Sequence, residues 1–374
     1  MVNLERMLEE FLTLVRIDSA PRQERLIADA LVDKLTQMGY APDEDQAGEA
    51  IGGNTGNLFL KIPGNLPGPT VMFCAHMDRV FPGFGIKPQV LIDRVISDGT
   101  TILAADDLAG VVQILEALRC LQEEKLPHAP LEILFTVSEE GGLFGAKNFD
   151  ATRSQADYAF FLDGGGEVGN LVVQAPSQAK ITVVFNGRAA HAGLEPEKGL
   201  NAIVVAAHAL TRMELGRIDQ ETTANVGIIN GGSATNIVPD RVEIRCEARS
   251  LQGAKLTDQV DKMVKACQEA ADTHGAAVEV TVEESYPSYC LDESAMIVKL
   301  AQAASHKIGR QPKLVPTGGG SDANILTGRG IASMVLANGL MNAHRLDEYI
   351  LLSELTKGAE QVLQLILMAP EFTA

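Results

Sequence analysis

One stretch, Leu131–Gly145, restricts the folds open to this chain more than any other part of the sequence. Its first part, LEILFTV, is rich in aliphatic, aromatic and β-branched residues, which predicts a largely buried β-strand. Two adjacent carboxylates, Glu139 and Glu140, follow the strand, and two glycines after them allow the backbone to turn sharply. Open α/β sheets bind ligands at the carboxyl ends of their strands, so this pattern predicts such a sheet with a functional edge.

The two carboxylates need not share a role, because adjacent side chains on an extended backbone point in opposite directions. One of them could bind a metal ion while the other transfers a proton. Taken alone, however, Glu139–Glu140 is more often a solvated acidic turn. The interpretation therefore depends on the partners that the rest of the chain supplies.

Strands alternate with amphipathic helices before and after a central region, which predicts a mostly parallel α/β sheet flanked by helices. One of these strands is expected over residues 95–107, with its own turn. Between residues 172 and 284 the order becomes strand–helix–strand–strand–helix–strand, which is the order of a split βαβ sandwich. We therefore predict a first domain formed by residues 1–171 and 285–374, with a second domain inserted at 172–284.

The overall composition excludes several classes of partner. The net charge of −18 argues against nucleic acid or an anionic membrane surface as the main partner. No apolar run approaches the roughly 18 residues that a membrane span needs, and the start of the chain lacks the pattern of a secretory signal. The five cysteines are scattered without a CxxC pair, which is typical of reduced thiols in a cytoplasmic protein.

Histidine and carboxylate residues follow five of the predicted strands. They are His76, Asp78, Asp106, Asp107, Glu139, Glu140, Asp163 and His344. Because these strand ends meet at one edge of the sheet, the side chains are expected to gather there. Imidazole and carboxylate ligands without thiolate suit zinc, cobalt or manganese, and a pair of such ions needs a bridging carboxylate. The sequence thus predicts a two-metal site that acidifies water, with a further carboxylate as its proton acceptor.

These motifs carry a resemblance to a known family. They are HMD at 76–78, ADDLAG at 105–110, SEEGG at 138–142, DGG at 163–165, and His344 with an acidic segment after it. In this order they resemble metallopeptidase family M20, and within it the peptidase T-like, or tripeptidase, branch. The resemblance covers nearly the whole chain. It implies a zinc-exopeptidase-like sheet with an inserted ferredoxin-like domain that serves as a lid and as a dimerisation domain.

The resemblance also implies a ligand set for two divalent ions per chain, with zinc first and cobalt or manganese as alternatives. His76 and Asp163 would hold one of the ions. Glu140 and His344 would hold the other. Asp106 would bridge the two ions and would be followed by a cis peptide bond.

Two neighbouring carboxylates are given other roles by the same resemblance. Glu139 would act as the general base and acid, and Asp78 would orient His76 through the free nitrogen of its ring. Aminopeptidase-like and dipeptidase-like members of the family carry aspartate at the position of Asp163, whereas carboxypeptidase-like and deacylase-like members usually carry glutamate. Asp163 therefore favours substrates that are bound through their N-terminal side.

The resemblance places substrate-binding residues in and near the inserted domain. They are His191, Asn236, Arg249, Gly319 and Gly320. His191 would contact the substrate, commonly in the site of the partner subunit of a homodimer. The glycine turn at 317–322 could instead cradle a phosphate, but it lacks the lysine and spacing of a P-loop, so a substrate carboxylate is the preferred ligand.

The predicted function is hydrolysis of short peptides, with release of the N-terminal residue of tripeptides as the leading hypothesis. A dipeptidase or an N-acyl-amino-acid amidohydrolase would use the same site and remains an alternative. A non-catalytic binding protein of this fold would have lost a metal ligand or the base, and the sequence retains all of them. We expect a homodimer formed through the inserted domain.

Overall fold

Four parallel strands form the centre of the larger of two units in the computed structural model, which describes residues 1–372. In spatial order they are β6 (Leu131–Thr136), β3 (Val71–His76), β7 (Tyr158–Gly164) and β16 (Ala332–Ala337). Every residue of β3 and β6 is buried, as their continuous apolar sequences predict for strands covered on both faces. The predicted mostly parallel α/β sheet is confirmed.

Further strands extend this sheet at both edges. Beyond β6 lie β2 (Leu58–Ile62) and β1 (Asp43–Glu44), and beyond β16 lie β8 (Asn170–Ala175), β14 (Tyr289–Cys290) and β15 (Lys313–Pro316). The pairs that join β2 to β6 and β8 to β16 are antiparallel. A separate small sheet contains β4 (Gln89–Val90), β5 (Arg94–Ile96), β18 (Tyr349–Leu351) and β17 (Leu340–Met341).

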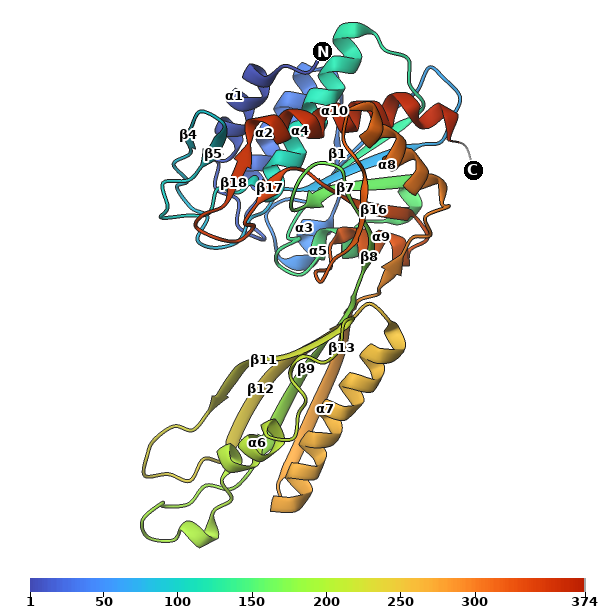
Figure 1. The fold of residues 1–374 in the computed structure, drawn as a ribbon. Helices are drawn as coiled ribbons and strands as arrows, with labels where there is room; N and C mark the ends of the chain where they lie inside the picture. Colours follow the sequence, from blue (N-terminus) through green and yellow to red (C-terminus); the bar gives the residue numbers. More distant parts are fainter. Residues whose placement is uncertain (373–374) are drawn as a thin grey trace. The chain divides into compact units, whose positions relative to one another are not determined.

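Helices cover both faces of the central sheet (Figure 1). One group packs together and contains α1 (Leu4–Leu14), α4 (Ala105–Glu124), α8 (Met296–Lys307) and α10 (Leu352–Met368), with α2 (Arg25–Gln37) near it. The other contains α3 (Ala47–Ile51), α5 (Phe144–Asn148) and α9 (Asp322–Gly328). Helix α4 is the most deeply buried of these, which explains why its sequence is apolar on nearly every side.

The glycine that ends the ADDLAG motif lets α4 lie directly on β7. A Cβ atom added to Gly110 would lie 2.7 Å from the Cβ of Leu162 and 2.4 Å from Oδ1 of Asp107. No side chain fits at these distances. Gly110 therefore sets how closely the start of α4 approaches the strand that carries Asp163.

The predicted strand over residues 95–107 is wrong. Only Arg94–Ile96 is extended in β5, and α4 already begins at Ala105. The reason is a long-range contact, because three backbone N–H groups that a strand would pair with a neighbour donate instead to the carboxylate of Glu348. They are those of Leu103 at 2.9 Å, Ala104 at 3.1 Å and Asp106 at 3.1 Å. Asp106 and Asp107 therefore do not end a strand, and their non-helical backbone angles form a kink just inside the start of α4.

The smaller unit contains residues Gln174–Tyr289 and Thr317–Gly320, whereas the predicted inserted domain spans 172–284. Its elements in chain order are β9 (Ser177–Asn186), α6 (Ala202–Leu210), β10 (Gly216–Arg217), β11 (Thr222–Gly231), β12 (Arg241–Ser250), α7 (Gly253–His274) and β13 (Ala277–Tyr286). The sheet order is β10-β11-β12-β9-β13 with antiparallel neighbours. Both helices pack on one face of this sheet (Figure 1), which confirms the ferredoxin-like fold.

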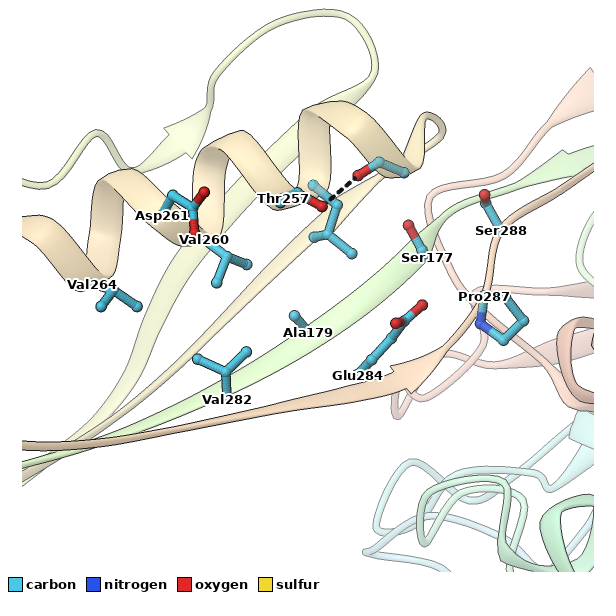
Figure 2. A pocket seen from close by; sticks show the side chains of 12 residues that line it. Ser177, Ala179, Thr257, Val260, Asp261, Val264, Val282, Glu284, Pro287 and Ser288 are labelled. Atoms are coloured by element: carbon cyan, nitrogen blue, oxygen red, sulfur yellow. Dashed lines mark hydrogen bonds between the residues drawn. The ribbon is translucent and has the colours of Figure 1, made fainter.

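Helix α7 leaves part of the edge strand β13 uncovered. Figure 2 shows the resulting groove, of about 590 Å³, with Val260 and Asp261 of α7 on one side and Ala179 and Val282 on the strands. Val282 is 47% exposed, although it lies on the helix-bearing face of the sheet. The edge at β13 is therefore less well covered than the centre of this sheet.

Among residues 1–372, no helix combines the length and the apolar character that crossing a membrane requires.

Candidate metal centre

The five predicted ligands lie together in the larger unit, at the carboxyl end of its parallel strands. His76 is the last residue of β3, Asp163 is the last but one of β7, and Asp106 lies in the first turn of α4. Glu140 follows β6, and His344 follows β17. Elements far apart in the sequence thus deliver one side chain each to the same place.

Asp106 lies between the two histidines. Its Oδ1 atom is 3.1 Å from Nε2 of His76, and its Oδ2 atom is 3.1 Å from Nε2 of His344. One carboxylate therefore faces a different imidazole with each of its oxygens, which is the arrangement that a bridging ligand requires. The peptide bond that follows it, to Asp107, is cis, as the resemblance implied.

Asp163 lies beside His76, and Glu140 lies beside His344, as the predicted ligand pairs require. Oδ1 of Asp163 is 3.8 Å from Nε2 of His76, and Oε1 of Glu140 is 2.7 Å from Nε2 of His344. One ligand atom from each of His76, Asp106 and Glu140 lies within 4.8 Å of the others. The geometry fits the predicted ligand set, while the role of each residue stays a prediction.

The electrostatics of the cluster favour positive charge. Hydrogen bonds with Asp106 and Glu140 raise the pKa of His344 to about 10. Burial lowers the pKa of His76, but hydrogen bonds with Asp106 and Asp78 outweigh burial and leave that pKa well above its usual value. The carboxylates thus raise the pKa of both imidazoles, which shows that the local field attracts positive charge.

The carboxylates respond to the same crowding. Burial and the neighbouring charge of Asp106 raise the pKa of Asp163 well above its usual value. Such mutual repulsion between buried carboxylates is relieved when a cation binds among them. Oxygen and imidazole nitrogen atoms without thiolate are the donor set of zinc, cobalt or manganese, so the residues present fit a divalent metal ion.

Glu139 is placed for a role in proton transfer. Its side chain is only 9% exposed, and burial together with the charge of Asp163 raises its pKa well above the usual value for glutamate. A general base works best when its pKa lies near the operating pH, and burial moves that of Glu139 in this direction.

Asp78 does more than the sequence indicated. Its Oδ1 atom accepts the backbone N–H of Glu139 at 2.9 Å, and its Oδ2 atom accepts that of Glu140 at 3.0 Å. The contact with Nδ1 of His76 is made by the backbone oxygen of Asp78 at 3.0 Å, with the carboxylate oxygen at 3.5 Å. Asp78 therefore orients His76 mainly through its main chain and positions the Glu139–Glu140 segment with its side chain.

Several buried residues that position the cluster were not found from the sequence. Oε1 of Glu24 accepts the N–H of Ser138 at 2.8 Å and its hydroxyl at 2.9 Å, directly before Glu139. The amide of Asn338 donates to Oδ1 of Asp107 at 3.0 Å. Glu24 lies directly before α2, far from Ser138 in the sequence, so no local pattern indicated this contact.

Asp322 is a further buried carboxylate close to the cluster. Its Oδ2 atom accepts the hydroxyl of Thr136 at 2.7 Å, and burial raises its pKa to about 6. The sequence pattern singled out its turn only for the glycines. The acidic segment after His344 could have indicated that Glu348 lies near the cluster. Nothing in the sequence indicated that its partners are the backbone N–H groups of Leu103, Ala104 and Asp106.

The predicted substrate-binding residues lie in the smaller unit and form two groups. In the first, Nδ1 of His191 accepts the backbone N–H groups of Gly193 at 3.1 Å and Leu194 at 3.2 Å. The carbonyl of Asn236 accepts the N–H of Ala192 at 2.9 Å, which joins His191 and Asn236 into one surface.

The second group joins Arg249 to the glycine turn. Arg249 forms an ion pair with Glu247, and its Nη1 atom lies 3.4 Å from the carbonyl oxygen of Gly318. The N–H of Gly319, which was expected to bind a substrate carboxylate, donates to the hydroxyl of Thr317 at 3.2 Å. A Cβ atom on Gly320 would lie 2.1 Å from the ring of Tyr286, so only glycine fits there.

Histidines and carboxylates at the carboxyl edge of a parallel sheet, with a buried carboxylate beside them, define the class of metal-dependent hydrolases. Residues 72–368 match the model of peptidase family M20/M25/M40, and the chain belongs to this family. The crystal structure of aminopeptidase PepT from Bacillus cereus is 44% identical over 98% of this chain and 99% of that chain, with a TM-score of 0.90.

Two other relatives point to the same branch of the family. A tripeptidase structure from Staphylococcus aureus is 38% identical over 99% of this chain and 100% of that chain, with a TM-score of 0.95. Peptidase T of Clostridium botulinum is 26% identical over 97% of this chain and 98% of its own length. The chain is thus a peptidase T-like hydrolase, as the motifs indicated.

The contacts of Glu348 generate a prediction. In Glu348→Ala, three backbone N–H groups lose their acceptor in a buried place, so the free energy of unfolding should fall by at least about 2 kcal/mol. Because Asp106 is one of the three residues, zinc affinity should also fall by roughly 10- to 100-fold. Urea denaturation and a competitive zinc titration measure the two effects.

The matched control is Glu360→Ala, which removes a carboxylate that pairs with Lys357 on the surface of α10. That change should leave zinc affinity as it is and alter stability by less than about 1 kcal/mol. Equal zinc affinity in Glu348→Ala and the unaltered protein would show that Glu348 does not position Asp106.

Proposed function

We propose that this protein is a two-metal aminopeptidase that releases the N-terminal residue of tripeptides. The observation that carries the proposal is the position of Asp106, whose two oxygens face His76 and His344 at 3.1 Å each. The likeness to an aminopeptidase and to a tripeptidase over nearly the full length of each chain supports the substrate class. Five free cysteines fit the cytoplasm as its location.

The chain would hold two divalent ions, most simply zinc, with cobalt or manganese as alternatives. His76 and Asp163 would bind one ion, and Asp106 would bind both. Glu140 and His344 would bind the other. When bound, such a pair supplies an acidified water and polarises the carbonyl of the scissile amide.

Glu139 would accept the proton of the attacking water and return it to the departing amine. Three features of the chain support this role. Burial raises the pKa of Glu139 well above its usual value, and Asp78 accepts the backbone N–H of Glu139 at 2.9 Å. The carboxylate of Glu24 restrains the preceding residue, Ser138, so that the whole turn is held in place.

The residues of the smaller unit would bind the peptide. Arg249 offers a guanidinium for a substrate carboxylate or carbonyl, and the 317–320 turn lies against it. His191 is exposed and carries a ring nitrogen that is free to face a substrate, since its Nδ1 atom is engaged by Gly193 and Leu194. Asn236 and the backbone at Gly319 and Gly320 would add further polar contacts.

A substrate panel tests the proposed function. The zinc-loaded protein should cleave tripeptides such as Ala-Ala-Ala to a free amino acid and a dipeptide, and should do so faster than it cleaves dipeptides. Blocking the N-terminus by acetylation should abolish cleavage, because the proposal places the free amine at the site. Mass spectrometry of the products measures both outcomes, and preferred cleavage of dipeptides or of N-acyl amino acids would establish the alternative instead.

The role of Glu139 generates a second prediction. Glu139→Gln keeps the size of the side chain but cannot accept a proton, so kcat should fall by at least about 10²-fold while the metal content stays unchanged. His76→Ala should lose metal as well as activity. Metal analysis combined with tripeptide kinetics separates the two variants, and near-normal kcat in Glu139→Gln would remove the role assigned to Glu139.

We also propose that the protein forms a homodimer through β11 and α6 of the smaller unit. Large aliphatic side chains are exposed along these elements: Ile228 and Ile229 on β11, and Ile203 and Val204 on α6. The surface is continuous, because a Cβ atom on Gly232, at the end of β11, would lie 3.5 Å from Cδ1 of Ile203. A second copy pairing along this edge would bury the strand edge and the apolar side chains together.

Light scattering tests the dimer. Ile229 is 50% exposed, and Ile229→Lys places a charge in the proposed interface, so this variant should be a monomer where the unaltered protein is a dimer. Val282→Lys is the matched control, because Val282 is 47% exposed on the opposite edge strand, β13. A monomeric unaltered protein, or a dimer that only Val282→Lys disrupts, would contradict the proposed interface.

A further inference from the structure

Two histidines of the smaller unit that have been given no role so far face one another. His208 lies in the last turn of α6, and His274 is the last residue of α7. Nδ1 of His208 is 3.0 Å from Nε2 of His274, and the two rings are nearly perpendicular, at 88°, with centroids 5.1 Å apart. The packing of α6 on α7 creates this pair from residues 66 positions apart in the chain.

In the absence of other partners the two rings share a hydrogen bond, with one nitrogen as donor and the other as acceptor. Such a bond holds the ends of the two helices together, and this structural role alone would explain the pair. The same two nitrogens, however, also present the separation of a bidentate metal site. The distance decides which ions fit it.

With a bond of about 2.0–2.1 Å from metal to imidazole nitrogen, a separation of 3.0 Å corresponds to a nitrogen–metal–nitrogen angle of about 94°. Tetragonal copper(II) and nickel(II) prefer angles of about 90° between neighbouring ligands. A tetrahedral zinc ion needs about 109°, and hence a separation of about 3.3 Å. The nitrogen–nitrogen separation of the pair therefore fits the ligand angle of a tetragonal ion better than that of a tetrahedral zinc ion.

We propose that His208 and His274 form a surface site for a tetragonal divalent transition-metal ion, copper(II) or nickel(II), distinct from the metal centre of the larger unit. Nδ1 of His208 and Nε2 of His274 would occupy two neighbouring ligand positions, and water would fill the others. The donor ring moves its hydrogen to its other nitrogen, so the site loses no net proton when the ion binds.

The surroundings of the pair favour this role. Both rings are half-buried and so remain open to solvent on one side. Each lies at the C-terminal end of its helix, where the partial negative charge of the backbone carbonyls attracts a cation. Partial burial and the neighbouring charges of Arg212 and His274 lower the pKa of His208, which keeps its ring in the neutral form that binds metals.

Arg212 is a neighbour of His208 whose charge opposes a cation there. It lies one helical turn beyond His208, and its side chain is exposed, so it can point into solvent. Within residues 1–372, the cluster of three or more metal-binding side chains is formed by His76, Asp106 and Glu140. His208 and His274 are not part of it. The new site therefore has two protein ligands and binds its ion more weakly and exchangeably than the metal centre.

Binding here would link α6 to α7. Because the ion would bind only where the two helix ends are held together, it would stabilise the folded smaller unit in proportion to its concentration. The structure thus assigns the pair as a metal-dependent clamp on the elements that carry the proposed dimer surface. This consequence does not require the protein to hydrolyse any peptide.

The experiment uses the intact zinc-loaded protein. Copper(II) or nickel(II) is added while retained zinc is measured, so that displacement from the metal centre is detected. We expect one additional ion per chain, and a copper EPR spectrum with hyperfine coupling to two nitrogens. The thermal unfolding temperature should rise as the ion is added.

The variants His208→Gln and His274→Gln keep a polar side chain at the helix ends but remove a ligand. Each variant should lower the affinity for the additional ion by at least about tenfold. Loss of a contact that merely supports a ligand already has an effect of this size. His306→Ala is the matched control, since His306 is an exposed histidine near the end of α8, and it should bind the ion normally. The basal peptidase activity of the zinc-loaded protein should be equal in all of them.

Three results would overturn the proposal. One is an unaltered protein that takes up no additional ion. Another is an additional ion whose affinity is the same in His208→Gln, His274→Gln and the unaltered protein. The third is a loss of binding in His306→Ala equal to that in the pair variants, which would place the ion elsewhere. Circular dichroism of each variant shows whether a loss of binding reflects a loss of fold.

Discussion

The carboxylate of Glu348 accepts three backbone N–H groups at the start of α4, where the predicted bridging residue Asp106 lies. The contact holds residues 103–106, which do not follow a strand pattern, where α4 begins. Asp106 is one of the three donors, so its main chain is held from the segment that also carries His344. One buried carboxylate thereby couples the central ligand to a ligand contributed from the other end of the sequence.

The same principle recurs on the opposite side of the cluster. The side chain of Asp78 accepts the N–H groups of both Glu139 and Glu140, while its main-chain oxygen contacts His76. Glu24 then restrains Ser138. Buried acceptors that hold backbone donors fix a turn more strongly than turn propensity does, because an unpaired buried N–H is costly. Glu139 and Glu140 are therefore held together as one segment.

Holding these carboxylates together in a buried place is electrostatically unfavourable, and this bears on what the site can bind. Burial and mutual repulsion raise the pKa values of Glu139 and Asp163, and hydrogen bonds with Asp106 and Glu140 raise the pKa of His344. A protein gains little stability from such a cluster by itself. The arrangement is accounted for when a cation binds, which agrees with a family of metal-dependent peptidases. The smaller unit, in contrast, carries its exposed aliphatic side chains and its histidine pair on an ordinary ferredoxin-like core.

The sequence by itself determined the class of fold, the candidate ligands and the family. Buried strands such as Val71–His76 have apolar sequences that are visible locally, and a histidine or carboxylate directly after them is equally visible. Only the tertiary structure showed that residues 95–107 are not a strand, that Thr317–Gly320 belongs to the smaller unit, and that His208 meets His274. Each of these depends on contacts between residues far apart in the chain. Periodicity reports which face of an element is buried, but it cannot report which distant side chain completes a hydrogen bond there.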